Sequence, residues 1–254
     1  MFKETDKKII SSLQNPVVKH TVKLRENASY REEKQRVLLF GKTLISELSS
    51  FLKPSQLLVL EGTSLEDLPF CENTLFATDN VFKKIANFTF ETAIAEFPLP
   101  NPTALDGKKY ILALDAVADP GNLGSLLRTA VALNWDGVFL LEGCCDLFND
   151  KTVRASRGAC LLLPFCYGTY EELFHFSEKN ALNFYVANTR GRRIDTIASA
   201  KNALLLLSNE ARGVKGEVKG KGEEITIPIS SKMESLNVAI AGGILMHALR
   251  QNDE

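Results

Sequence analysis

Three short polar segments interrupt the apolar second half of the chain, and they carry the side chains that could do chemistry. They are Asp115–Ala130, Leu207–Val214 and Ile227–Gly243. Each follows an apolar run that is predicted to be a buried strand, and each places Asn, Arg, Glu or Ser where that strand would end. Ligands of α/β sheets bind at the carboxyl ends of the strands. The three segments together therefore predict one binding site built from three parts of the chain.

The first segment combines a turn with a helix that carries one arginine. Asp119–Asn122 has strong turn chemistry, because proline fixes φ and glycine tolerates positive φ. Asn122 is predicted to cap the helix that follows. Apolar residues recur at helical spacing over 123–131, so this helix has one apolar face. Ser125 and Arg128 share another side of it. The turn does not account for Arg128, which taken alone is interpreted as a surface arginine.

The second segment follows the apolar run Ala203–Leu207 and contains Glu210 and Gly213. A carboxylate directly after a buried strand, followed by glycine, could close a binding loop. Charged loops after strands are common, so this segment has little meaning by itself.

The third segment leads into a helix built from small residues. Ser235 is predicted to cap this helix. A glycine inside a helix costs about 1 kcal/mol relative to alanine, so Gly242 and Gly243 predict close packing on another backbone or on a second subunit. Ser235 is not a predicted nucleophile, because the sequence offers no G-x-S-x-G elbow and no obvious histidine partner.

The composition of the 254 residues is that of an ordinary soluble protein, with 45% hydrophobic and 24% charged residues and a net charge of −1. The five cysteines form no C-x-x-C pair and only three histidines are present, which argues against disulfides and against a metal site. No signal-peptide core and no membrane-spanning run is found. A reducing cytoplasm is the expected compartment. Residues 1–42 are locally basic, which indicates a polyanionic partner.

The chain divides at the proline-rich stretch Glu96–Lys109, which is predicted to be a linker. We expect a small α/β domain over residues 1–100 and a larger domain over 106–254. In the first, Gly41–Phe51 and Asn80–Ala86 are predicted helices, and Gln56–Leu60 is a predicted strand. Strands and helices alternate in the second, which predicts a parallel sheet with crossover helices. Its expected strands are Tyr110–Leu114, Gly137–Leu141, Phe184–Ala187, Ala203–Leu207 and Glu224–Ile229.

In this order, the three polar segments resemble the three sequence motifs of the SpoU/TrmH family, the RNA ribose 2′-O-methyltransferases of the SPOUT class. The resemblance covers roughly residues 110–250 and includes Lys151–Ala159, which is similar to a family segment between the first two motifs. Ser11–Glu47 is similar to the L30e-like α/β substrate-binding domain that many members carry. The resemblance implies an α/β SPOUT domain with a deep trefoil knot, S-adenosylmethionine as cofactor, and a homodimer whose active site uses both subunits.

The resemblance also implies roles for individual residues. The family's catalytic arginine falls on Arg128, its first asparagine on Asn122 and its glutamate on Glu210. Its last serine and asparagine fall on Ser235 and Asn237. The positions that line the cofactor fall on Ser208, Ile227 and Leu236.

One departure from the family pattern lies in the second segment. The family usually has glycine where this chain has Ser208, and serine carries a Cβ that leaves less room for the cofactor beside the backbone. The expected reaction is S-adenosylmethionine-dependent methylation of a ribose 2′-hydroxyl, with ribosomal RNA favoured over transfer RNA. Two alternatives stay open: an RNA-binding protein of this fold without catalysis, and a Rossmann-type oxidoreductase, which would lack its usual G-x-G-x-x-G.

Overall fold

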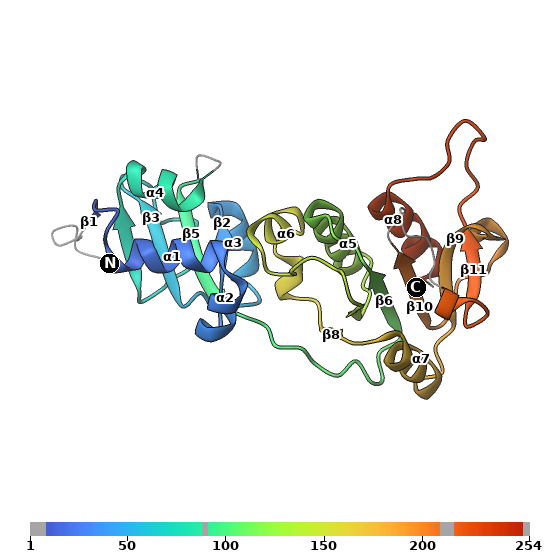
Figure 1. Ribbon diagram of the computed structural model, residues 1–254. Coiled ribbons are helices and arrows are strands. Elements are labelled where there is room, and N and C mark those ends of the chain that lie inside the picture. Colours follow the sequence, from blue (N-terminus) through green and yellow to red (C-terminus); the bar gives the residue numbers. More distant parts are fainter. Residues whose placement is uncertain (1–8, 88–90, 209–215, 251–254) are drawn as a thin grey trace. The chain divides into compact units, whose positions relative to one another are not determined.

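The computed structural model describes residues 9–87, 91–208 and 216–250, and these form two compact units. One unit contains Met1–Pro100 together with Phe148–Leu161, and the other contains Asn101–Leu147 and Leu162–Glu254. Figure 1 shows their helices and strands. No helix in the described ranges is long and apolar enough to cross a membrane.

The N-terminal unit is built on a mixed five-stranded sheet with the order β1-β4-β3-β5-β2. β1, β4 and β3 pair in parallel, whereas β5 runs antiparallel to both of its neighbours. Its strands are β1 (Ile9–Ile10), β2 (Arg36–Phe40), β3 (Gln56–Leu60), β4 (Thr74–Ala77) and β5 (Ala93–Pro98). Its helices are α1 (Pro16–Glu26), α2 (Ala28–Lys34), α3 (Lys42–Leu48), α4 (Asp79–Ala86) and α6 (Asp150–Ala155).

Helices cover both faces of this sheet because the side chains of its strands alternate between two apolar faces. Leu38 and Phe40 of β2 share a core with residues of α1 and α4. α3 and α6 also pack against β2. Shortly after α6, a Cβ on Gly158 would lie 2.2 Å from Leu48 of α3 and 3.5 Å from Leu39 of β2. The chain that follows α6 therefore packs closely against α3 and β2.

The C-terminal unit is built on a six-stranded sheet, with the order β11-β9-β10-β6-β7-β8, in which all pairs are parallel. Its strands are β6 (Tyr110–Asp115), β7 (Gly137–Leu140), β8 (Phe165–Tyr167), β9 (Phe184–Arg193), β10 (Ala203–Ser208) and β11 (Glu223–Thr226). Its helices are α5 (Pro120–Ala132), α7 (Tyr170–Lys179) and α8 (Val238–Leu249). The expected parallel sheet with crossover helices is confirmed.

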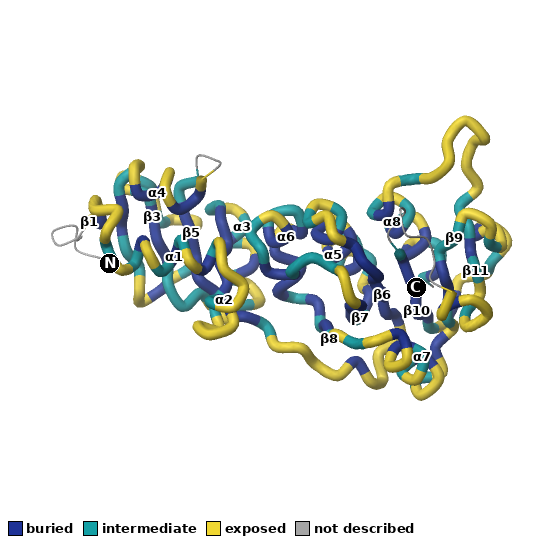
Figure 2. Tube along the Cα trace, viewed as in Figure 1, coloured by how far each residue is buried: buried dark blue, intermediate teal, exposed yellow. Residues whose placement is uncertain are grey.

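The central strands of this sheet are apolar because helices cover both of their faces. Leu204 and Leu206 of β10 belong to a core shared with α7. α8 packs against β10 and α5 on the other face. Figure 2 shows β6 and β10 buried, whereas the segment between β11 and α8 is largely exposed.

The slim helix predicted from Gly242 and Gly243 is α8, and only one of its two glycines is tightly enclosed. A Cβ on Gly242 would lie 2.4 Å from Leu126 of α5 and 2.6 Å from Leu207 of β10. A Cβ on Gly243 would meet its nearest neighbour, Thr129, at an ordinary 3.6 Å. The close packing expected from the sequence is therefore met at Gly242, against side chains rather than against a backbone.

Candidate active site

The three polar segments leave the sheet at the carboxyl ends of β6, β10 and β11. β6 ends at Asp115 and β10 ends at Ser208, and these two residues are directly paired in register. β11 ends at Thr226, immediately before the third segment. Because all of the strands run in parallel, their carboxyl ends lie at one edge, where α/β sheets bind ligands.

A hydrogen bond joins the first segment to the third. Asn237 donates from Nδ2 to Oδ1 of Asn122 at 2.9 Å, across 115 positions of sequence. Asn122 lies in the first turn of α5, and Asn237 lies directly before α8. Two of the residues predicted from the sequence are therefore in contact, which links the start of both helices.

Both helix caps predicted from the sequence were wrong. Asp119, not Asn122, caps α5 by accepting the Asn122 backbone N–H at 2.7 Å. The reason is Pro120, which suits the first helical position because it has no N–H to leave unpaired, so the cap is the residue before it. Asn237, not Ser235, caps α8 by accepting from Ala239 and Ile240. That helix begins at Val238, too far along the chain for Ser235 to cap it.

A cavity of about 490 Å³ lies beside this sheet edge. Four residues predicted from the sequence line it, namely Ser208, Ile227, Ser235 and Leu236. Its apolar wall includes Leu207, Ile225, Val238 and Leu245. Hydroxyl groups come from Thr226, Ser230 and Ser231. A mostly apolar cavity of this size with a few polar groups is typical of sites for small ligands.

Sequence reasoning missed part of the wall that β9 provides. Ala187, Asn188 and Thr189 line the cavity, and Asn188 donates to Glu224 at 2.9 Å. The signal was present, because polar residues also follow the apolar run Phe184–Ala187. The structured strand continues through Arg193, so these residues lie inside β9 and not in a loop after it.

Arg128 lies on the exposed side of α5, as does Ser125. It makes no hydrogen bond or ion pair with any residue in the described ranges, so its guanidinium is available to a ligand. Its neighbours Leu126 and Leu127 are buried, which fixes the helix that carries it. Glu210, the carboxylate predicted for the second segment, lies outside the described residues.

A buried polar cluster lies at the ends of β6 and β10, and two of its residues, Asp115 and Tyr170, were assigned no role from the sequence. The Asp115 side chain is 1% exposed, and its carboxylate interacts with the hydroxyl of Tyr170 at the start of α7. Burial raises the pKa of Tyr170, and the nearby Asp115 carboxylate raises it further, whereas the Ser208 hydroxyl acts in the opposite direction. Ser208, the departure from the family pattern, therefore has a polar neighbour in Tyr170.

Comparison with known proteins decides the family. The SpoU rRNA methylase family model matches residues 109–247, which is more than half of the chain and includes all three polar segments. The chain belongs to the SpoU rRNA methylase family. The match confirms the family and the rRNA methyltransferase class predicted from the three segments, and it excludes the Rossmann-type oxidoreductase.

Relatives of known sequence or structure extend this likeness over nearly the whole chain. A 23S rRNA (guanosine(2553)-2′-O)-methyltransferase of Bacillus subtilis is 29% identical over 96% of this chain and 99% of its own length. The structure of a putative RNA methyltransferase of the TrmH family from Porphyromonas gingivalis has 29% identity and a TM-score of 0.80, covering 92% of this chain and 96% of that one.

A third likeness is to an rRNA methyltransferase from Sinorhizobium meliloti whose structure contains bound S-adenosylmethionine. It is 26% identical, has a TM-score of 0.81, and covers 95% of this chain and 97% of that one. The predicted fold class, a SPOUT domain that follows a smaller N-terminal α/β domain, is confirmed. The trefoil knot stays a prediction.

Proposed function

We propose that this protein transfers a methyl group from S-adenosylmethionine to a ribose 2′-hydroxyl of ribosomal RNA. The observation that carries the proposal is the Asn237–Asn122 hydrogen bond, which joins two of the three family segments beside the cavity. Transfer RNA is the second candidate substrate. The 2′-hydroxyl is the group that distinguishes RNA from DNA.

The cavity fits an adenosyl cofactor by its size and by the chemistry of its walls. It has about 490 Å³ of space, with apolar side chains beside serine and threonine hydroxyls. Ser208, Ile227 and Leu236 come from the ends of β10 and β11 and from the segment before α8, and they are the residues proposed to hold the cofactor. When bound, the cofactor supplies a methyl group on a positively charged sulfur.

In the proposed reaction the bond from methyl carbon to sulfur breaks as the bond to the 2′-oxygen forms, and the hydroxyl proton is released. Arg128 cannot take that proton, because a guanidinium stays protonated in proteins. Its exposed position suits a different role, which is to bind the RNA phosphate beside the reacting ribose and hold the hydroxyl in line. The proton leaves through that phosphate or through water.

The remaining predicted residues have supporting roles in this proposal. Asn122 and Asn237 hold the starts of α5 and α8 together, which fixes Arg128 relative to the cavity. Ser235 shapes the cavity wall. Glu210 is proposed to orient Arg128 or the RNA from the second segment.

We also propose a homodimer and a division of labour along the chain, with residues 1–100 binding RNA and residues 106–254 forming the methyltransferase domain. Two large apolar side chains one helical turn apart on α8 support the dimer, because Ile240 is 58% exposed and Ile244 is 41% exposed. Replacing both with aspartate should convert a dimer to a monomer in size-exclusion chromatography with light scattering. A wild-type protein that is monomeric at micromolar concentration would contradict this part of the proposal.

The reaction is tested with purified protein, radiolabelled S-adenosylmethionine, and unmodified transcripts of ribosomal and transfer RNA. We expect label in ribosomal RNA and, after digestion, a nucleoside methylated on the ribose. Isothermal titration calorimetry separates the alternative that the protein only binds RNA, since such a protein would bind no S-adenosylmethionine. Mapping ribose methylations in cells with and without the gene then identifies the nucleotide.

A further inference from the structure

A second cavity, also of about 490 Å³, lies wholly within the N-terminal unit. Its walls come mainly from α1, with Tyr30 of α2 and Lys84 of α4. Lys19, Lys23 and Lys84 line it, and no acidic residue does so among those described. The chain as a whole has a net charge of −1, so this is a local concentration of positive charge, which attracts polyanions.

The Tyr30 ring forms an aromatic surface at this cavity. The Nζ atoms of Lys23 and Lys34 each lie 5.4 Å from the ring centroid, and Lys34 also pairs with Glu33 at 2.8 Å. The His20 ring meets Tyr30 edge to face, with centroids 5.6 Å apart. A partly exposed aromatic ring beside lysines is the combination on which proteins stack the bases of single-stranded nucleic acid.

A buried carboxylate holds the two rings in place. Tyr30 Oη and His20 Nδ1 share a hydrogen bond of 2.8 Å, and His20 Nε2 lies 3.4 Å from Glu96. Glu96 is 6% exposed in the middle of the sheet, where Gln56 donates to it at 3.0 Å. Burying a carboxylate is unfavourable unless partners compensate. The position of Tyr30 is therefore fixed by a built network rather than by chance at the surface.

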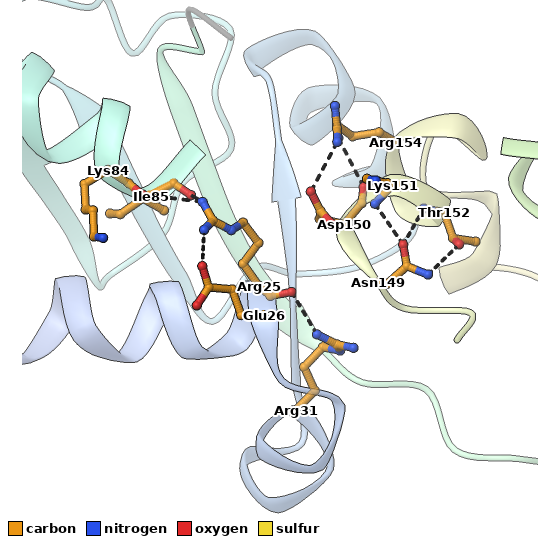
Figure 3. Close-up of polar contacts among 10 residues, drawn as sticks. All are labelled: Arg25, Glu26, Arg31, Lys84, Ile85, Asn149, Asp150, Lys151, Thr152 and Arg154. Carbon is orange, nitrogen blue, oxygen red and sulfur yellow. Dashed lines mark hydrogen bonds and ion pairs between the residues drawn. The ribbon is translucent and has the colours of Figure 1, made fainter. Parts of the chain in front are cut away.

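Two arginines join helices whose residues line the cavity. Figure 3 shows polar contacts of Arg25 and Arg31. Arg25 of α1 donates to the backbone carbonyls of Lys84 and Ile85, which holds the end of α4 against α1. Arg31, which is buried, donates to the carbonyls of Leu24 at 2.7 Å and Arg25 at 3.1 Å. These contacts set the corner between α1 and α2, and with it the helix that carries Tyr30.

We propose that this cavity binds one nucleotide of a single-stranded segment of the RNA substrate, with the base against Tyr30 and the phosphates at Lys19, Lys23 and Lys84. The proposal rests on the proposed function, which makes RNA the polyanion. Proteins recognise RNA largely at unpaired bases that stack on aromatic side chains. His20 and Glu96 act as positioning residues, because they reach the base only through Tyr30.

The test measures binding of the full-length protein to an unmodified 23S rRNA transcript by filter binding at several salt concentrations. Tyr30→Ala removes the stacking surface and should weaken binding about ten-fold. Lys84→Gln should weaken binding a few-fold. It should also reduce the slope of log affinity against log salt concentration by about one, which corresponds to the loss of one phosphate contact. Lys83→Gln is the matched control, because Lys83 directly precedes Lys84 on α4 but does not line the cavity. Lys83 is exposed and pairs with Asp79. The control variant should bind like the wild type.

A second readout locates the contact directly. RNA that carries 4-thiouridine should crosslink under ultraviolet light to the peptide that contains Tyr30. Tyr30→Phe keeps the ring and should retain most of the affinity that Tyr30→Ala loses. If Tyr30→Ala does not fold, Lys23→Gln and Lys84→Gln carry the test at exposed positions.

Unchanged affinity and salt dependence in Lys23→Gln, Lys84→Gln and folded Tyr30→Ala would overturn the proposed nucleotide site. That outcome is distinct from failure of the proposed function, because calorimetry with S-adenosylmethionine and methylation by the wild type are measured separately. A wild type that methylates RNA while these variants bind it normally rejects this cavity alone. A wild type that binds no S-adenosylmethionine rejects the proposed function, and the RNA-binding comparison still decides the cavity.

Discussion

The two sheets of this protein place their polar groups in different ways. In the C-terminal sheet, all of the strands are parallel, and the buried carboxylate Asp115 lies at the end of β6, paired with Ser208 at the end of β10. In the N-terminal sheet, β5 runs against its neighbours, and the buried polar group is Glu96, inside the strand. Glu96 reaches outward to His20 on α1.

This difference follows from strand direction. Carboxyl ends collect at one edge only where strands are parallel, so a ligand can meet several segments at once there. In a mixed sheet the strand ends are divided between two edges, and the groups proposed to bind RNA lie instead on the helices. A site at the strand ends of a parallel sheet is recognisable in the sequence as polar motifs that follow apolar runs. A site on helices consists of basic and aromatic residues that are scattered along the helical sequence.

The largest effect is expected at the strand-end site. Replacing Arg128 with alanine should lower methyl transfer at least about 100-fold, because positioning of the reacting groups depends on it. Arg128 makes no hydrogen bond or ion pair within the described ranges, so stability and binding of S-adenosylmethionine should stay near wild-type values. Kinetics with labelled cofactor and calorimetry give the two readouts.

Two variants sharpen this result. Arg128→Lys keeps the charge but loses the two-pronged geometry, so it should recover only part of the rate. Ser125→Ala lies on the same exposed side of α5 and should be nearly silent. Normal turnover in Arg128→Ala would remove Arg128 from the reaction and leave the strand edge without its phosphate-binding group.

The next effect concerns packing beneath the site. Gly242→Ala and Gly243→Ala gain the same helix propensity, about 1 kcal/mol each. Only the first places a methyl group within 2.6 Å of Leu126 and Leu207. Gly242→Ala should therefore be less stable than Gly243→Ala by about 1–3 kcal/mol. Urea unfolding measures the difference, and equal stability would show that the leucines move aside freely.

A smaller effect separates the two roles of Asn237. Asn237→Ala loses the helix cap and should reduce stability by about 1 kcal/mol. Asn237→Asp keeps a good cap but replaces the donor to Asn122 with an oxygen, so stability should hold while methyl transfer falls roughly ten-fold. If the contact matters, Asn122→Ala should show the same loss, and the double variant should lose no more. Additive losses would mean that the two residues act independently.

Four of the five strands predicted for the C-terminal unit match the structure to within three residues at each end, because continuous apolar runs between turn residues are a strong signal. β9 continues beyond its predicted end through Arg193, and β8 was not predicted. The N-terminal unit was harder. β1, β2, β4 and β5 were not predicted individually, and β5 extends into the first residues of the predicted linker, where Glu96 and Pro98 indicated a polar turn. Whether such a segment forms a strand depends on the neighbouring strands with which it pairs, and the local sequence pattern does not show them.

The segment Phe148–Leu161 shows a second limit of the sequence. It lies between β7 and β8 along the chain, yet it clusters with the N-terminal unit. Arg157 pairs with Glu47 at 2.8 Å, and Gly158 lies against Leu48. The apolar positions of a short helix such as α6 show which face is buried, but they do not show which sheet it is buried against.

The smallest effect tests the buried carboxylate of the N-terminal sheet. Burial raises the pKa of Glu96 above its ordinary value of 4.5, although His20 acts in the opposite direction. As pH rises from about 4.5 through that raised pKa, the unfolded chain ionises first, and the folded state loses stability relative to it. Glu96→Gln resembles the protonated form, so it should match the wild type at pH 4 and be slightly more stable at pH 7. Urea midpoints between pH 4 and 7 measure this difference in stability.

Glutamine at position 96 keeps an acceptor for His20, so Glu96→Gln should bind RNA far better than Tyr30→Ala. A wild type that is more stable than Glu96→Gln at pH 7 would mean that its contacts with His20 and Gln56 outweigh the burial of the charge.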